Sequence, residues 1–242
     1  MVGLMENSAP KYKRILLKLS GEALSGGKDG ILNFEMIDSV AKVLLKCVND
    51  GIEVAVIVGA GNIWRGAKGV NVDRNRADSM GMLATAINAL ALEDVFTKAG
   101  LDAKVMSAVE MNAFADRYTP REAIKALEAG KVVIVACGTG SPFFSTDTAG
   151  ALRAAEIKAD AILMAKNIDG IYSADPKLDK NAVKYEEITY KEILAGELKA
   201  LDLTATAFCM DNNIKCYAFG LSDPENIYRV VMGEKIGTEI HK

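Results

Sequence analysis

Short runs of apolar and β-branched residues recur along the chain. Five of them stand out, at residues 15–17, 54–58, 132–136, 161–164 and 216–219. A run that is apolar at every position, rather than at every second one, is typical of a strand buried on both faces of a sheet. A weaker run at 103–107 predicts a sixth strand.

Helical patterns fill the intervals between these strands. Before Gly51, apolar residues at the three-and-four spacing of one helix face predict a first helix, at Ile37, Val40, Ala41, Leu44, Leu45 and Val48. We expect three further helices: from about Met80 to Lys98, from the Thr-Pro-Arg-Glu capping box at 119–122 to Gly130, and from Asp223 to about Gly233.

Strands that alternate with helices predict an α/β protein whose mostly parallel sheet is covered by helices on both faces, a three-layer αβα sandwich. No Gly/Ser/Pro-rich linker and no internal repeat divides the chain. We therefore expect one domain over residues 11–242 and disorder in residues 1–10. Ligands of such sheets bind beyond the carboxyl ends of the strands.

Composition narrows the chemistry. The 242 residues carry 29 Lys+Arg against 32 Asp+Glu, a formal net charge of −3. The overall charge therefore gives no electrostatic attraction to nucleic acid or to an anionic membrane. The only histidine, His241, lies one residue from the end of the sequence. Catalytic triads, Cys-His pairs and HExxH zinc sites are thereby disfavoured.

The four cysteines are scattered and form no CxxC pair, which is typical of reduced cysteines in a cytosolic protein. No apolar run approaches the roughly 18 residues of a membrane span. We expect a cytoplasmic protein with neither a nucleic acid nor a membrane as its partner.

Two loops that follow strands contain groups suited to phosphate. Lys18 lies near the end of the first strand, which runs into Ser20 and Gly21, and this places an ammonium beside exposed backbone N–H groups. A strand-end lysine that simply reaches water is the alternative. The loop at 59–66 adds small residues and Arg65, but it matches neither GxGxxG nor a Walker A motif.

Two later loops contain groups suited to a nucleoside. The loop at 138–147 combines hydroxyls with Phe143 and Phe144 ahead of a helix expected to begin at Thr148. The alternative is an ordinary hydroxyl-rich cap with both rings in the core. In the segment at 166–176, Tyr172 either stacks on a purine or serves in packing.

Four segments together resemble the amino-acid kinase superfamily, and closely its bacterial uridylate kinase branch. They are Lys-Leu-Ser-Gly-Glu-Ala-Leu at 18–24, Asp-Ser-Met-Gly-Met-Leu-Ala-Thr at 78–85, the loop at 139–147, and Asp-Gly-Ile-Tyr at 169–172. The resemblance implies the amino-acid kinase fold and a homohexamer that phosphorylates UMP with ATP and Mg²⁺, with GTP and UTP as effectors. It also implies that the part up to about residue 150 holds UMP and the remainder holds ATP.

The same resemblance implies roles for individual residues. The catalytic groups would be Lys18, Arg65 and Asp147. ATP would be bound by Lys18, Leu19, Ser20, Gly21, Gly61, Arg65, Lys166, Asn167, Tyr172 and Asp175. UMP would be bound by Ala60, Asp78, Thr139, Gly140, Ser141, Pro142, Phe143, Phe144, Ser145 and Thr146.

Ala60 stands where many relatives have glycine and Lys166 where some have threonine, so which of Lys166 and Asn167 meets ATP stays open. No metal ligands are expected from the protein itself, because Mg²⁺ enters with ATP.

The absence of a catalytic histidine agrees with phosphoryl transfer, because a UMP phosphate is already an oxyanion at neutral pH and needs no general base. Two alternatives remain. One is a kinase of the same superfamily that acts on a carboxylate or carbamate, such as an acetylglutamate or glutamate kinase. The other is a nucleotide-binding storage or sensor protein. For two residues a structural role also remains: Asp78 as a helix cap, and Asp147 as a complement to a helix dipole.

Overall fold

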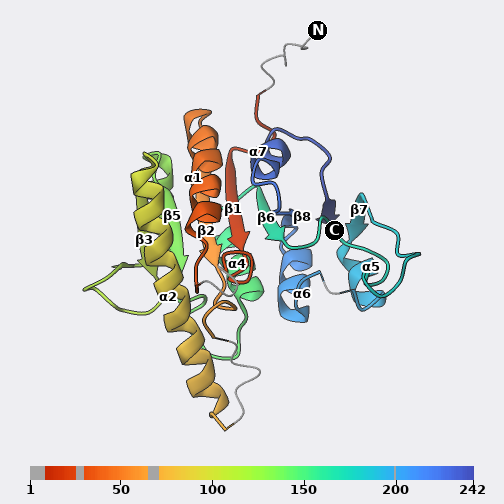
Figure 1. The fold of residues 1–242 in the computed structure, drawn as a ribbon, viewed down its shortest axis with the longest axis horizontal. Helices are drawn as coiled ribbons and strands as arrows, with labels where there is room; N and C mark the ends of the chain where they lie inside the picture. Colours follow the sequence, from red (N-terminus) through yellow and green to blue (C-terminus); the bar gives the residue numbers. More distant parts are fainter. Residues whose placement is uncertain (1–8, 26–29, 65–70, 199) are drawn as a thin grey trace.

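The computed structural model describes residues 9–25, 30–64, 71–198 and 200–242. Within them one sheet of nine strands runs through the molecule, in the order β4-β3-β5-β2-β1-β6-β8-β9-β7 (Figure 1). All neighbouring strands are parallel except the pair β8 and β9. The strands are β1 Arg14–Leu19, β2 Glu53–Val58, β3 Ala103–Ser107, β4 Asp116–Arg117, β5 Val132–Ala136, β6 Ala161–Lys166, β7 Glu187–Thr189, β8 Lys215–Gly220 and β9 Thr238–His241.

Helices cover both faces of this sheet, as the sequence predicted. One buried cluster joins the sheet to α1, α2 and α7, and a second joins its other face to α3, α4, α5 and α6. Figure 1 shows α1 and α2 side by side on the first face. The helices are α1 Phe34–Asn49, α2 Arg74–Lys98, α3 Pro120–Glu128, α4 Thr146–Glu156, α5 Tyr190–Ala195, α6 Leu203–Asp211 and α7 Asn226–Val231.

The six predicted strands are confirmed, but two helices begin earlier than the sequence suggested. Helix α2 begins at Arg74 instead of near Met80, because Asp73 accepts the N–H of Arg76 and caps it there. Helix α4 begins at Thr146 instead of Thr148, with Ser145 as its cap. The short strands β4, β7 and β9 and the helices α5 and α6 were not predicted.

Alternation along the strands decides which side chains reach the site. In β1, Ile15, Leu17 and Leu19 point to the α1 side, whereas Leu16 belongs to the α4 side. Because successive strand residues alternate, Lys18 also points to the α4 side. Lys166 at the end of β6 has the same parity as Ile162 and Met164 on that side. The two lysines therefore face the same helix layer.

Helix α2 is, among the described helices, the one whose length and composition would allow it to cross a membrane. Its inner face nevertheless packs on the sheet, where Ala89, Leu92 and Phe96 are completely buried. Its outer face exposes Met80, Leu83 and Ile87. The helix is thus a core helix of the domain that also presents an apolar outer stripe.

Candidate active site

The four loops identified from the sequence meet at one edge of the sheet. They follow β1, β2, β5 and β6, which are neighbours in parallel register, so their carboxyl ends lie together. This is the edge at which α/β sheets bind ligands.

The loops after β1 and β2 touch each other through their backbones. A Cβ on Gly21 would lie 2.6 Å from the backbone N of Gly61 and 2.7 Å from the carbonyl oxygen of Gly59. The N–H of Gly59 donates to the carbonyl of Leu19 over 3.0 Å. Only glycine at position 21 allows this approach, so the two loops form one continuous backbone surface.

Beside this surface lies a cluster of charged side chains. Lys18 forms an ion pair with Asp147, in the first turn of α4, and both side chains are mostly buried. The ammonium group of Lys166 donates to the carbonyl of Ala200. Burial, followed by the nearby charge of Lys18, lowers the pKa of Lys166 to about 8, while Asp147 opposes that shift. Two lysines and one carboxylate thus leave an excess of positive charge.

Asp147 is held in place by the cap of its own helix. The hydroxyl oxygen of Ser145 accepts the N–H groups of Asp147 and Thr148, at 3.0 and 3.1 Å. The Ser145 hydroxyl donates to Asp202, which also caps α6. The hydroxyl of Ser145 is therefore engaged within the protein.

A cavity of about 130 Å³ adjoins the glycine contact on the α2 side. Seven of the residues assigned to UMP line it: Ala60, Asp78, Thr139, Ser141, Phe144, Ser145 and Thr146. Met82 and Thr85 of α2 complete the wall that faces them. Gly140, Pro142 and Phe143 belong to the same loop but lie outside this lining.

Asp78 is not a helix cap. It lies in the second turn of α2, which begins at Arg74, so the cap alternative is wrong. Its carboxylate accepts the Nε–H of Arg74 and the backbone N–H of Phe143, both over 2.8 Å. Asp78 therefore joins α2 to the loop after β5.

Both phenylalanines of that loop are exposed, Phe143 by 64% and Phe144 by 52%, which excludes the alternative that they belong to the core. Phe143 has a φ of 70°, a conformation that the hydrogen bond to Asp78 helps to hold. The guanidinium of Arg74 lies over the Phe143 ring, 5.6 Å from its centroid. The rings are therefore available to a ligand.

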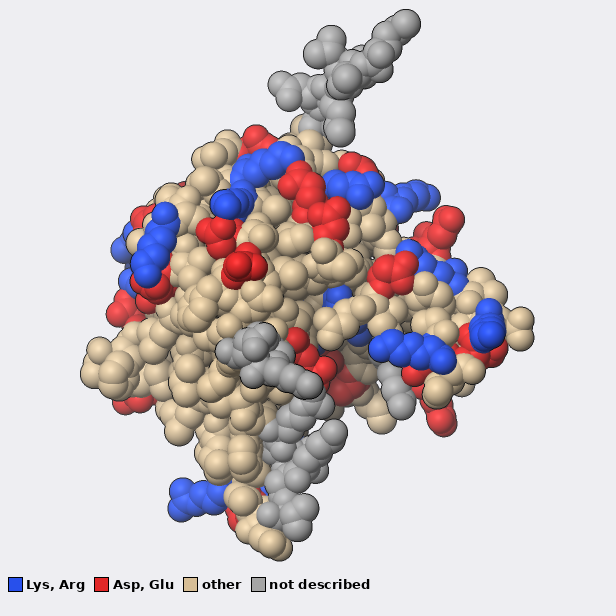
Figure 2. All heavy atoms as spheres, in the orientation of Figure 1, with Lys and Arg blue, Asp and Glu red and all other residues tan. Residues whose placement is uncertain are grey.

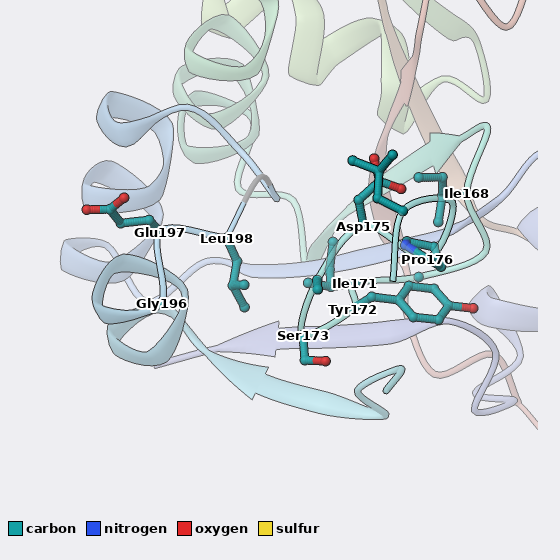
Figure 3. Close-up of a pocket in the computed structure, with 12 residues that line it drawn as sticks. Ile168, Ile171, Tyr172, Ser173, Asp175, Pro176, Gly196, Glu197 and Leu198 are labelled. Carbon is teal, nitrogen blue, oxygen red and sulfur yellow. The ribbon is translucent and has the colours of Figure 1, made fainter. Parts of the chain in front are cut away.

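A larger cavity, of about 430 Å³, lies on the opposite side of the charged cluster, beyond β6. Figure 3 shows its two walls, with Leu198 on one side and the segment carrying Ile171, Asp175 and Pro176 on the other. The carboxylate of Glu197 points away from it. Tyr172 also lines the cavity, and its hydroxyl donates to Asp169 over 2.8 Å.

The remaining assigned residues have the following places. Leu19 is completely buried, so only its backbone can meet a ligand. Ser20 belongs to the turn after β1, where its carbonyl accepts the N–H groups of Ala23 and Leu24. Asn167 is exposed and lies outside the lining of the larger cavity, whereas the Lys166 ammonium donates to the carbonyl of Ala200. Arg65 lies outside the described residues.

Sequence reasoning missed several groups that shape the site. Asp202 ties α6 to α4, and Leu198 forms a wall of the larger cavity. Asn88 is a completely buried polar residue on the inner face of α2. A polar side chain on an apolar helix face was the available signal for Asn88, but its partners come from distant loops.

The sequence profile of the amino acid kinase family matches residues 13–220. The chain belongs to the amino acid kinase family. Within it, the protein is similar to solved UMP kinases. The Bacillus anthracis UMP kinase is 36% identical, with 95% of this chain and 96% of that one covered and a TM-score of 0.91. The Ureaplasma parvum UMP kinase is 39% identical, with 95% and 99% covered and a TM-score of 0.90.

A uridylate kinase from Archaeoglobus fulgidus is 33% identical over 93% of this chain and 99% of that one, with a TM-score of 0.73. The similarity thus extends over nearly the whole chain, and the amino-acid kinase fold is confirmed. The family match over residues 13–220 includes the segments at 18–24, 78–85, 139–147 and 169–172.

The lowered pKa of Lys166 predicts a pH dependence of nucleotide binding. Below about pH 8 the ammonium is protonated and attracts phosphate, and above that pH the free protein loses this charge. We expect the KM for ATP to rise as the pH increases from 7 to 9, and Lys166→Met to show a raised KM that no longer follows pH in this range.

Initial-rate kinetics at several pH values check this prediction. Lys191→Met, a replacement of an exposed lysine on α5, is the matched control and should behave like the unaltered protein. If Lys166→Met keeps the pH dependence of the unaltered protein, Lys166 is not the group that titrates.

Proposed function

We propose that the protein transfers the γ-phosphoryl group of ATP to UMP, giving UDP, a step of pyrimidine nucleotide synthesis. The observation that carries this proposal is the placement of two cavities on either side of one positively charged cluster. The cavity beside α2 suits the acceptor, since the Asp78 carboxylate lies there for the ribose and the exposed Phe144 ring for the base. The larger cavity beyond β6 suits the donor nucleotide. The UMP kinases that this chain resembles support the choice of acceptor.

The proposed roles follow from the geometry. The backbone N–H groups of the Gly21 and Gly61 loops bind phosphate oxygens, and Lys18 offsets the charge that builds up as the phosphoryl group passes between two polyanions. Lys166 adds a second positive charge on the donor side. Asp147 holds the Lys18 ammonium toward the reacting groups. Arg65, by the resemblance, clamps phosphate from the loop after β2.

Mg²⁺ is proposed to arrive with ATP. Among the described residues no group of three or more His, Cys, Asp or Glu side chains could hold a metal. This donor set fits a Mg²⁺ ion that would be bound mainly by nucleotide phosphates and water, and Asp147, which pairs with Lys18, is the carboxylate of the charged cluster that could contact it. The ion would neutralise phosphate charge, while the protein residues align donor and acceptor.

The alternatives suit the site less well. An acyl acceptor has no ribose to engage Asp78 and no ring to stack on Phe144, yet both line the acceptor cavity. A storage or sensor protein has no need for Lys18 paired with Asp147 between two cavities.

The resemblance further supports a cytoplasmic homohexamer that responds to GTP and UTP. The cysteines are free and buried, as expected of a reducing compartment. Residues 79–92 of α2 carry no charge, and Figure 2 shows the surface over this helix as mostly uncharged. The exposed Met80, Leu83 and Ile87 form a stripe that a second copy of the chain can cover.

A comparison of acceptors tests the proposed function. With ATP and Mg²⁺, we expect UMP to be converted to UDP, CMP and dCMP to react far more slowly, and N-acetylglutamate not at all. Chromatographic separation of the products identifies the phosphorylated acceptor. Turnover of CMP as fast as that of UMP, or no turnover of UMP, would contradict the proposal.

Asp78→Asn tests the acceptor site. Charge-assisted hydrogen bonds to the ribose hydroxyls contribute roughly 1.5 to 3 kcal/mol, and asparagine removes part of this. We expect the KM for UMP to rise about tenfold, the preference for UMP over dUMP to narrow, and the KM for ATP to stay nearly unchanged.

Steady-state kinetics with UMP and dUMP measure both effects. Asp73→Asn is the matched control, because Asp73 caps α2 and asparagine caps a helix equally well. If Asp78→Asn behaves like this control, Asp78 does not contact the acceptor.

A further inference from the structure

A pair of asparagine amides, from the buried Asn88 and the half-buried Asn62, lies beneath the contact between the two glycine loops. Asn88 of α2 donates from Nδ2 to the side-chain Oδ1 of Asn62 over 2.8 Å, and its own Oδ1 accepts from Nδ2 of Asn62 over 2.9 Å. The second Nδ2 hydrogen of Asn88 goes to the carbonyl of Gly59 over 2.8 Å, and that of Asn62 to the carbonyl of Ile31 over 2.9 Å. Every amide hydrogen of the pair thus has an acceptor.

This pair meets the loop surface directly. A Cβ on Gly21 would lie 2.7 Å from Oδ1 of Asn62, as close as it would lie to the carbonyl of Gly59. The amide of Asn62 therefore fills the space under Gly21, and its position sets how far the loop after β2 stands from the loop after β1. Asn88 is 0% exposed, so its amide has no water with which to exchange these bonds.

We propose that Asn88 is a positioning residue for phosphoryl transfer. Through its hydrogen bonds to Asn62 and to the carbonyl of Gly59, it fixes the 59–62 segment against Gly21. The backbone N–H groups of both loops are thereby oriented toward the same phosphate group. Asn88 lines neither cavity and has no contact with the reacting groups. Its effect on catalysis rests on the proposed function, whereas its effect on the loop does not.

The apolar side chains around Asn88 explain why this role is specific to an amide. Ala84, Ala89 and Leu92, its neighbours on α2, are all buried, and Ala89 and Leu92 pack in the sheet cluster. A leucine at position 88 would suit such surroundings better, since it would leave no polar group to satisfy. It would also leave the Gly59 carbonyl and the Asn62 amide without their partner.

The chain supplies its own reporter for this loop. Trp64, the only tryptophan, ends the segment, and its indole Nε1 donates to the carbonyl of Ala77 on α2 over 2.9 Å. Gly81 of the same helix lies under the indole ring, where a Cβ would be 3.7 Å from Cδ1. A loop that moves away from α2 therefore exposes the indole and shifts its fluorescence emission to longer wavelength.

The test uses Asn88→Asp in the full-length protein. The carboxylate keeps the size of the side chain but cannot donate to Gly59 or to Oδ1 of Asn62, and it repels both oxygens. We expect the emission of Trp64 to shift to longer wavelength and kcat to fall by about 10- to 100-fold, since small misplacement of aligned groups has effects of this size. The KM values for UMP and ATP should change less than threefold.

Asn212→Asp is the matched control. Asn212 also donates through Nδ2 to a backbone carbonyl, that of Phe208, but at an exposed helix end far along the chain. It should leave emission, kcat and KM unchanged. Unchanged Trp64 emission in folded Asn88→Asp, or an increase in KM with normal kcat, would overturn the proposal.

Asn62→Ala keeps the proposal testable if Asn88→Asp does not fold. Position 62 is only half-buried, and alanine removes the pair from the loop side. We expect the same emission shift and the same loss of kcat. Normal emission and turnover in this variant would overturn the proposal. If the unaltered protein itself does not turn over UMP, the proposed function fails, and an emission shift in the variant still supports the position of the loop.

Discussion

The approach of Gly21 to Gly59 and Gly61 is the contact on which the rest of the site depends. Strands β1 and β2 are parallel neighbours, and neighbouring strands lie about 4.8 Å apart, so side chains would ordinarily keep the loops that follow them from touching. Glycine at position 21 removes that obstacle. The proposed function places the transferred phosphoryl group beside the backbone surface that results.

Successive side chains of a strand point to opposite faces of the sheet, and this alternation places two lysines near the backbone surface. Lys18 and Lys166 end strands that are adjacent in the sheet, and their parity directs both toward α4. There Asp147 meets Lys18 from the first turn of the helix. In the proposed function a protein with a net charge of −3 holds two polyanions, because the positive charge of Lys18 and Lys166 is concentrated at one place. No histidine is needed for this chemistry.

Helix α2 connects the parts of the acceptor side. Asp78 holds the backbone of Phe143, Thr85 accepts the N–H of Cys137 over 2.8 Å, and Asn88 holds the Gly59 loop. One rigid helix thus fixes the loops after β2 and β5 relative to each other. The same helix carries the exposed apolar stripe, so contact with a second copy of the chain would act on the element that positions the site.

The buried strands and the loops that follow them could be predicted from the sequence, because continuous apolar runs have few other uses in a soluble protein. The start of α2 could not, since residues 74–79 are mostly polar and the helix is set by the Asp73 cap. The pairing of Asn62 with Asn88 joins residues 26 positions apart and depends on tertiary packing. Leu198 and Asp202 were missed for the same reason: the sequence pattern does not show which loop a distant segment will face.

The central claim is that the two glycine loops form one phosphate-binding surface because glycine at position 21 lets their backbones meet. Gly21→Ala tests it most directly, with kcat, KM and the thermal midpoint measured together. Gly30→Ala is the control, since a Cβ there would meet only the carbonyl of Leu32, at 3.9 Å. The account predicts a folded Gly21→Ala protein whose kcat falls by about 10² or more, as for loss of aligned phosphate donors. A Gly21→Ala protein with the turnover of the Gly30→Ala control would contradict it.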